Sequence, residues 1–443
     1  MTDDWTIRLR EHGLSAAASR LAAAQFARSA TVFADRFGGK PASAWWIPGR
    51  IEVLGKHTDY GGGRSLLCTV ERGFHLVARP NAEGMVRLLD AKTGARFEVP
   101  LRADVPPQPG RWVDYPITVV RRVARDFATA RTGMDATFVS TLPPASGLSS
   151  SSALVIAAFL PLAEVNHLAA TPEWSASLPD RGAIAGYLGA VENGKAFGPF
   201  PADHGVGTHG GSEDHTAILC CRSGHLSQYH FLPVTAERET PLPSGWIFVI
   251  AMSGVHAAKG SGALERYNKL ALEVRTMLNT WHDQTSRDDC SLFAALRSSA
   301  DAPEKLEAML RHAGDKGAPL LERLAQFRAE TEEIIPAVTA ALARGDAKAI
   351  GPLVHRSQSL AERVLQNQVP ETIHLAGRAR ELGAAAASAF GAGFGGSVWA
   401  LVAAEDGEAF LARWRSDYLE TFPAHRARAD FFLTNAGPAA GTV

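Results

Sequence analysis

The stretch Pro48-Gly-Arg-Ile-Glu-Val-Leu-Gly-Lys-His-Thr-Asp-Tyr-Gly-Gly-Gly63 decides how the whole chain is interpreted. Its first half is apolar enough to form a buried strand, and its second half brings Lys56, His57 and Asp59 into a turn before three glycines. A solvated loop with charged side chains is the alternative interpretation. A polar cluster that follows an apolar strand is more typical of a binding site. The stretch therefore predicts that a strand delivers Arg50 and these three side chains to a functional site.

A second segment, Leu142-Pro-Pro-Ala-Ser-Gly-Leu-Ser-Ser-Ser-Ser-Ala-Leu154, has four consecutive serines at the beginning of an apolar helix. Gly147 lets the backbone approach a ligand closely because glycine has no side chain. The first turn of a helix has unpaired N–H groups that bind phosphate. The segment lacks the Gly-Lys-Ser/Thr of a P-loop. It predicts either another kind of phosphate site or a serine-rich helix cap without a ligand.

A third segment, Ser388-Ala-Phe-Gly-Ala-Gly-Phe-Gly-Gly-Ser397, comes directly before an apolar strand. Its glycines allow a turn that closes on a phosphate group or packs beneath one. Taken alone, the segment favours a plain tight turn, because glycine-rich turns are common.

The chain has 443 residues, a length that predicts two domains. Predicted strands dominate the first half and predicted helices the second, which indicates an α+β protein. We expect domains at residues 1–235 and 236–443, because a stretch rich in Pro and Glu lies near that boundary. The main expected elements are helices at 5–37, 149–165 and several segments between 263 and 382, and strands at 42–54, 65–77, 85–89, 136–142 and 246–252. Pro336 and the Gly351–Pro352 pair should kink or divide two of the later helices.

The composition argues against several classes of function. The formal net charge is −1, so no overall field attracts nucleic acid or an acidic membrane. Four cysteines match no metal-ligand spacing, and we expect reduced thiols and a cytoplasmic location. The N-terminus lacks the pattern of a signal peptide, and the apolar runs are too short to span a membrane.

The three quoted segments, in this order, resemble the signature motifs of the GHMP kinase superfamily. The first is similar to the galactokinase signature, which reads roughly Gly-Arg-Val-Asn-Leu-Ile-Gly-Glu-His-Thr-Asp-Tyr. The resemblance extends over about residues 42–403 through Arg111–Tyr115, Glu192-Asn193, Gly207–Asp214 and Tyr267-Asn268. Three motifs in family order are a strong signal, although each alone is weak. The resemblance implies a two-domain α+β GHMP kinase fold with the active site in the cleft between the domains.

The resemblance also implies an ATP- and Mg²⁺-dependent kinase that phosphorylates the anomeric hydroxyl of a monosaccharide. Asp214 corresponds to the acid that accepts or orients the proton of the attacking hydroxyl, and Arg50 to the arginine beside it. The sugar-binding residues implied are Lys56, His57, Asp59, Gly211 and Tyr267. The ATP-binding residues implied are Trp112, Gly147, Leu148, Ser149, Ser150, Ser151 and Ser152, with Ser151 and Glu192 as Mg²⁺ ligands. We expect a sugar and ATP as the only partners, and a monomer or weak homo-oligomer.

Lys56 departs from the galactokinase pattern, because the family has Glu at this position. Replacing a carboxylate by an ammonium reverses the charge and turns a hydrogen-bond acceptor into a donor. One hypothesis is therefore a substrate that carries an acceptor at that end, such as a uronic acid. The alternative is that Lys56 points away from the substrate and pairs with Glu52, which itself stands where the family has Asn.

Other departures surround Asp214. Glu213 and His215 stand where the family has Met and Gln, and an extended backbone there would let only one of Glu213 and Asp214 face the sugar. We expect that residue to be Asp214. His204 and His209 lie in the preceding loop, which we expect to be solvated because their spacing fits no zinc site.

Two further functions compete with a sugar kinase. A kinase for a non-sugar alcohol is disfavoured by the His-Thr-Asp-Tyr motif, which belongs to the sugar-kinase branch. A non-catalytic sensor of sugar and nucleotide is disfavoured because the proposed proton acceptor Asp214 is retained. Sugar-dependent release of ADP separates an enzyme from a sensor.

Overall fold

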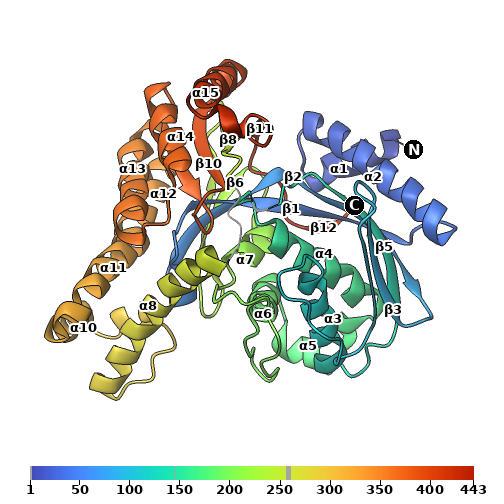
Figure 1. The fold of residues 1–443 in the computed structure, drawn as a ribbon, viewed down its shortest axis with the longest axis horizontal. Coiled ribbons are helices and arrows are strands. Elements are labelled where there is room, and N and C mark those ends of the chain that lie inside the picture. The colour runs from blue at the N-terminus through green and yellow to red at the C-terminus, as the bar shows by residue number, and fades with distance from the viewer. Residues whose placement is uncertain (1, 145, 256–260) are drawn as a thin grey trace.

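The structure is a computed structural model that describes residues 2–144, 146–255 and 261–443. Two sheets organise it (Figure 1). The first sheet has the strand order β12-β1-β2-β5-β3-β4, and β6 and β7 extend it from β2. Its strands are β1 (Ser43–Leu54), β2 (Arg64–Asn81), β3 (Met85–Asp90), β4 (Arg96–Pro100), β5 (Gly133–Ser140), β6 (His225–His230), β7 (Thr235–Pro241) and β12 (Gly441–Thr442). The expected strands in this half of the chain are all present.

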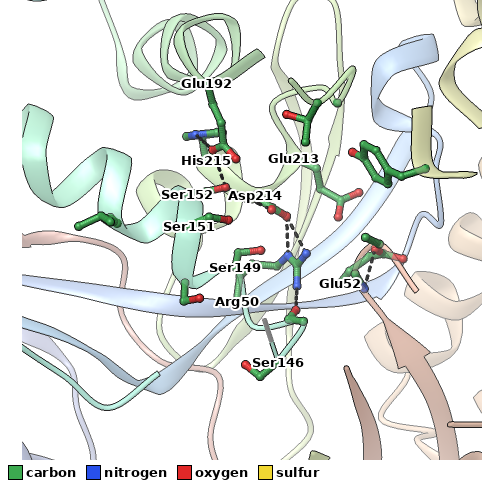
Figure 2. Close-up of a pocket in the computed structure, with 18 of the residues that line it drawn as sticks. Arg50, Glu52, Ser146, Ser149, Ser151, Ser152, Glu192, Glu213, Asp214 and His215 are labelled. Carbon is green, nitrogen blue, oxygen red and sulfur yellow. Dashed lines mark hydrogen bonds and ion pairs between the residues drawn. The ribbon is translucent and has the colours of Figure 1, made fainter. Parts of the chain in front are cut away.

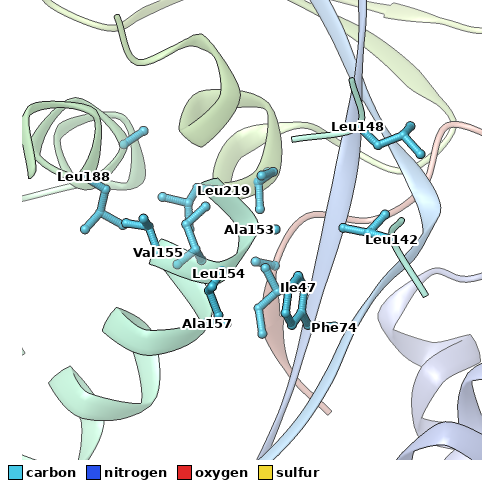
Figure 3. Close-up of a cluster of buried hydrophobic side chains, with 14 of the residues drawn as sticks. Ile47, Phe74, Leu142, Leu148, Ala153, Leu154, Val155, Ala157, Leu188 and Leu219 are labelled. Atoms are coloured by element: carbon cyan, nitrogen blue, oxygen red, sulfur yellow. The ribbon is translucent and has the colours of Figure 1, made fainter. Parts of the chain in front are cut away.

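The first sheet is covered on both faces because its strands alternate their apolar side chains. Trp46 of β1 packs with Phe26 and Phe33 of α2 (Ala16–Phe37) on one face. The neighbouring residue, Ile47, points to the other face and packs in the core against α4 (Ser150–Val165). Figure 3 shows this core, in which Ile47 and Phe74 of the sheet lie beside Leu154 and Val155 of α4. The helices on that second face are α3 (Asp114–Asp126), α4, α6 (Arg181–Asn193) and α7 (Glu213–Cys220), with the short α5 (Pro172–Ser177) nearby.

The second sheet is fully antiparallel, with the order β11-β8-β10-β9. It consists of β8 (Trp246–Met252), β9 (Ala386–Phe390), β10 (Ser397–Ala403) and β11 (Asp430–Thr434). Helices α14 (Pro370–Glu381) and α15 (Gly407–Thr421) share a buried core with it. The remaining helices of this half are α8 (Ser261–Thr285), α9 (Leu292–Leu296), α10 (Ala302–His312), α11 (Ala318–Arg328), α12 (Ile335–Ala343) and α13 (Gly351–Leu360). The predicted two-domain α+β architecture is thus confirmed.

The chain moves from the first sheet to the second between Pro241 and Trp246, a few residues after the expected boundary at 235/236. It returns at its end, where β12 pairs with β1 through Trp45 and Thr442. The first sheet is therefore built from the first half of the chain and from its last strand. The division into domains at 235/236 stays a prediction.

Several helix boundaries follow from local signals. The expected single helix at 5–37 is two helices, because Gly13 has a φ of 114° between α1 (Thr2–His12) and α2, and Ser15 caps α2. Pro352 lies in the first turn of α13, directly after a 3₁₀ turn, whereas Pro336 follows the π-helical segment Ala329–Ile334 that joins α11 to α12 without a break. None of the helices within the described ranges is long and apolar enough to cross a membrane.

A buried ion pair within α3 is also hydrogen-bonded to α6, and both helices support the site. Arg122 of α3 donates from Nε to Asp126 Oδ2 at 2.7 Å, and Tyr187 of α6 donates to the same oxygen at 2.9 Å. Both charged side chains are 1% exposed. A buried charge that loses its partner is strongly destabilising, because no water replaces the lost contact.

We therefore expect Asp126→Ala to lower the free energy of unfolding by about 3–5 kcal/mol, since it leaves the Arg122 guanidinium buried without its carboxylate. Urea unfolding followed by circular dichroism measures the change. Asp104→Ala is the control, because Asp104 forms an ion pair with Arg102 on the surface and its loss should leave the unfolding midpoint unchanged. A similar midpoint for both variants would contradict the prediction.

Candidate active site

Nearly all the residues that the sequence singled out line one cavity of about 570 Å³. Its walls come from β1 and the turn after it, the serine-rich segment that begins α4, the ends of α6 and α7, Tyr267 of α8 and the loop of residues 391–395. Segments from both halves of the chain line it, as expected for a cleft between two domains. The predicted site residues in its lining are Arg50, His57, Asp59, Trp112, Gly147, Ser149, Ser150, Ser151, Ser152, Glu192, Gly211, Asp214 and Tyr267.

Arg50 and Asp214 meet inside this cavity (Figure 2). Arg50 lies on β1 and donates from Nε to Asp214 Oδ1 at 2.7 Å, while Asp214 lies in the first turn of α7. The same guanidinium donates from Nη1 to Gly147 O at 2.5 Å. Burial is the largest single effect and would raise the pKa of Asp214, but the adjacent Arg50 cation and smaller favourable contacts together outweigh it and hold that pKa below its usual value. Asp214 is therefore an ionised carboxylate at neutral pH.

The serine-rich segment brings backbone N–H groups to the cavity. Ser149 adopts left-handed backbone angles, φ 56° and ψ 43°, directly before α4 begins at Ser150. Gly147 also has a positive φ of 81°, and a Cβ atom there would lie 3.3 Å from Phe390 O. The unpaired N–H groups of the first turn of α4 are the kind that bind phosphate. The close approach of Gly147 to the C-terminal loop explains why this position needs glycine.

A cluster of oxygen atoms lies beside the beginning of α4. Ser152 donates from Oγ to Glu192 Oε2 at 2.8 Å and lies 3.3 Å from Asp214 Oδ2. Ser151 also lines the cavity, but Ser152 is the serine for which a bond to Glu192 is seen. His215 Nε2 lies 3.1 Å from the same Glu192 oxygen.

This donor set fits a hard divalent cation. Mg²⁺ prefers oxygen ligands and is commonly held by one or two carboxylates together with substrate phosphates. The cluster supplies few protein ligands, and the described part of the chain contains no group of three or more His, Cys, Asp or Glu side chains arranged to hold a metal unaided. A cation here would need phosphate oxygens to complete its coordination.

Asp59 and Gly211 pack tightly at the other end of the cavity. Asp59 Oδ2 accepts the backbone N–H of Glu213 at 3.2 Å, and a Cβ on Gly211 would lie 2.3 Å from that oxygen. Glycine is therefore needed at 211, because any side chain would displace Asp59. Burial raises the pKa of Asp59.

His57 joins the turn after β1 to the loop of residues 391–395. Its Nδ1 lies 3.1 Å from Tyr60 Oη and its Nε2 lies 3.2 Å from Ala392 O. Burial, supported by the nearby Arg323 cation, lowers the pKa of His57 to about 3. The ring is thus neutral, and since a carbonyl only accepts, Nε2 carries the proton that is donated to Ala392.

Two residues expected at the site do not line the cavity. The Leu148 side chain is buried in the core (Figure 3), and its carbonyl accepts the backbone N–H of Arg50 at 3.2 Å. Lys56 is 1% exposed, and its ammonium has no hydrogen-bond partner among the described residues. A direct contact between Lys56 and a ligand in the cavity is not supported by this geometry.

Glu52 occupies the cavity wall near Lys56. Its Oε2 accepts the backbone N–H of Gly391 at 3.2 Å, so β1 holds the start of the C-terminal glycine loop. Burial raises the pKa of Glu52 to about 7, although the nearby Lys56 and Arg50 cations oppose that rise. The alternative in which Lys56 pairs with Glu52 thus holds only as an interaction of nearby charges, because no ion pair within 4.0 Å joins the two side chains.

The backbone around Asp214 differs from the sequence expectation. Glu213 and Asp214 begin helix α7 and are not extended, so their side chains do not point to opposite sides. Successive residues on a helix are about 100° apart, and Glu213, Asp214 and His215 all line the cavity. Ser212 followed by two acidic residues was the available signal, because it is the pattern of a helix N-terminus.

His204 and His209, which we expected to be solvated, differ in burial: the His204 side chain is partly buried and His209 is exposed. His204 Nε2 lies 3.2 Å from Asp114 Oδ2, while the backbone N–H of His209 donates to Asn268 Oδ1 at 2.9 Å. Ser388 is buried and donates to Gln358 Oε1 at 2.9 Å. The glycine loop lines the cavity through Gly391, Gly393 and Gly395.

Three family models match the chain in succession. The galactokinase galactose-binding signature matches residues 31–80, the GHMP kinases N-terminal domain matches residues 114–198, and the GHMP kinases C-terminal domain matches residues 338–420. These ranges include the strand that carries Arg50, the serine-rich segment with Glu192, and helices α13 and α14 beside the second sheet.

Galactokinases are similar to the chain over nearly all of its length. The galactokinase of Streptomyces coelicolor is 28% identical over 382 residues, which cover 84% of this chain and 87% of the relative. The galactokinase of Canis lupus familiaris is 26% identical over 426 residues, covering 94% and 95%. The crystal structure of Lactococcus lactis galactokinase complexed with galactose superposes with a TM-score of 0.76 at 23% identity, covering 94% of this chain and 98% of that one. The order of the matched motifs and the cavity that they build together identify the chain as a galactokinase-like sugar kinase of the GHMP kinase superfamily.

Proposed function

We propose that the protein transfers the γ-phosphoryl group of ATP to the anomeric hydroxyl of a monosaccharide in a Mg²⁺-dependent reaction. The observation that carries the proposal is the contact between Arg50 and Asp214 next to the N-terminus of α4. It combines a carboxylate that accepts a proton with a cation and backbone N–H groups that bind phosphate oxygens.

In this reaction Asp214 accepts the proton of the sugar hydroxyl while the hydroxyl oxygen of the sugar forms a bond to the γ-phosphorus. The bond between that phosphorus and the β–γ bridging oxygen breaks, and ADP leaves. Arg50 helps to keep Asp214 ionised, and its charge beside that carboxylate would stabilise charge on the transferred group. Most of the rate enhancement comes from positioning and charge stabilisation, as in other phosphoryl transfers.

The nucleotide is proposed to lie along the serine-rich segment, with its phosphates at Gly147 and Ser149–Ser152 and its base near Trp112. Glu192 with Ser152, or with Ser151 as the family motif implies, would hold the cation. Mg²⁺ bound there neutralises phosphate charge. The loop of residues 391–395 lines the same cavity and contacts His57 through Ala392 O and Glu52 through Gly391 N.

The sugar is proposed to bind against His57, Asp59, Gly211 and Tyr267, next to Asp214. A uronic acid substrate was one hypothesis from the sequence, and it requires the Lys56 ammonium in the cavity. Lys56 is not among the lining residues, so no observation here favours that substrate.

A sensor without catalytic activity is the second candidate, and the ionised Asp214 beside Arg50 argues against it because binding alone does not need a proton acceptor. We further propose a cytoplasmic enzyme, because all four cysteines are free thiols. We propose that it works as a monomer or weak homo-oligomer.

Asp214→Asn tests the proposed base. The amide keeps the shape of the side chain but cannot accept the proton, so sugar-dependent ADP release should fall by about 10²–10⁴-fold. A coupled ADP assay over neutral hexoses, N-acetylhexosamines, pentoses and uronic acids measures the rate. Asp104→Asn, an exposed aspartate outside the cavity, should retain full activity. If the wild type binds sugar and ATP in thermal-shift measurements but releases no ADP, the protein is a sensor and the proposal is wrong.

Glu192→Gln tests the proposed cation site. Removal of the charge should raise the Mg²⁺ concentration for half-maximal activity about 10-fold or more, and it should weaken the Mg²⁺-dependent rise in melting temperature with ADP. Ser151→Ala and Ser152→Ala compare the two serines in the same assays. Glu239→Gln is the control, because Glu239 also accepts a serine hydroxyl, from Ser227 at 2.9 Å, but lies outside the cavity. An unchanged Mg²⁺ requirement in Glu192→Gln would exclude Glu192 as a ligand.

A further inference from the structure

Glu213 is a buried acid in the cavity wall that the reaction described above does not use. It is 6% exposed and lines the cavity together with its neighbour Asp214. The galactokinase-like motif has Met at this position, which does not form comparable hydrogen bonds. A carboxyl group taken out of water needs compensating contacts, so its position in the wall calls for an explanation.

The contacts of Glu213 place it at the sugar end. Its backbone N–H donates to Asp59 Oδ2 at 3.2 Å, and its Oε2 accepts the Ser65 hydroxyl at 2.6 Å. No hydrogen bond joins the other oxygen, Oε1, to any residue of the described ranges. Oε1 of Glu52 is fully enclosed and has no partner, but Oε1 of Glu213 is not enclosed in this way. Ser65 thus anchors one oxygen and leaves the second available to the cavity.

Figure 2 separates the two ends of the cavity. Ser151, Ser152 and Glu192 lie on one side of the Arg50–Asp214 pair, whereas Glu213 and Glu52 lie on the other. Phosphate-binding groups occupy the first side, so the second side is left for the sugar. Glu213 therefore borders the part of the cavity where Asp59 and Gly211 also lie.

The charges around Glu213 are mostly negative. Burial, together with the carboxyl groups of Glu52 and Asp59, raises the pKa of Glu213 well above its usual value. The Arg50 cation is engaged by Asp214 and does not pair with Glu213. A neutral carboxyl group both donates and accepts hydrogen bonds, which suits a sugar hydroxyl. A carboxylate on the ligand would add a further anion to this group of acids, and like charges placed together are unfavourable.

We propose that Glu213 is a substrate-binding residue whose Oε1 forms a hydrogen bond with a hydroxyl group of the sugar, and that the acidic sugar end selects neutral sugars over sugar acids. The inference rests on the proposed sugar kinase function and names the substrate class of that site. Ser65 acts as a positioning residue for the Glu213 carboxyl group.

The test compares Glu213→Met, which removes the hydrogen-bonding group, with Glu213→Gln, which retains a donor and an acceptor in the same shape. Steady-state assays with galactose, glucose and their uronates give kcat and KM for sugar and for ATP. We expect Glu213→Met to raise the KM for the neutral sugar about 10-fold while kcat and the KM for ATP stay within about threefold. Glu213→Gln should stay within about threefold of wild type. Wild type should use the neutral sugar at least about 10-fold more efficiently than the matching uronate.

Glu239→Gln is again the matched control, because it alters a serine-bonded glutamate outside the cavity and should change none of these values. Glu213→Asp is a second test if Glu213→Met does not melt cooperatively. It keeps the acid but shortens the side chain, and it should also raise the sugar KM. An unchanged sugar KM in the variant that folds overturns the role of Glu213, and a wild-type preference for the uronate overturns the selection.

These outcomes differ from failure of the proposed function. If wild type fails to release ADP with every sugar tested, the kinase proposal fails. Calorimetric binding of galactose to wild type and to Glu213→Met then tests Glu213 directly. A 10-fold weaker Kd in the variant supports the contact. Equal Kd values, or no galactose binding by wild type, overturn it.

Discussion

One contact organises the site: the Arg50 guanidinium between Asp214 Oδ1 and Gly147 O. It ties strand β1, the serine-rich segment and helix α7 together at a single point, although the residues are distant in the sequence. A buried guanidinium is stable only when its donors are satisfied and its charge is balanced. The same requirement that stabilises the fold here therefore brings the proposed proton acceptor Asp214 to the serine-rich segment.

Glu52 extends this arrangement to the C-terminal half of the chain. It lies two residues after Arg50 on β1, so the two side chains leave the strand on the same face. Arg50 holds Gly147, and Glu52 holds the N–H of Gly391. The cation and the anion on one strand thus place both glycine-containing loops against the cavity, and Lys56 compensates part of the negative charge from outside it. Lys56 therefore lies among the protein's own acids, and Glu52 and Glu213 are acids of the cavity wall beside the proposed sugar site.

Much of this protein could be predicted from local patterns. The strand of residues 43–54, the helix after the serines and the glycine turn each have a signature within about 15 residues, which is why their types agreed with expectation. Predictions of side-chain direction depended on the local backbone, which the residue types alone did not determine. An extended backbone would turn Glu213 away from the site, but Glu213 lies at the N-terminus of α7 and lines the cavity. Ser152 is bonded to Glu192, and Ser151, the serine of the motif, lines the same cavity, so the choice of cation ligand stays a prediction.

The sequence by itself determined the class of chemistry, because the order of the motifs and the residue types within them need no knowledge of distances. Arginine, aspartate, serines and glycines in that order already indicated phosphoryl transfer to a sugar. Only the tertiary structure decided which charged groups share the cavity. Burial and pairing depend on contacts between residues that are up to about 340 positions apart, as between Glu52 and Gly391. The two positions that depart most from the motif, Lys56 and Glu213, acquired their opposite placements outside and inside the cavity from those long-range contacts.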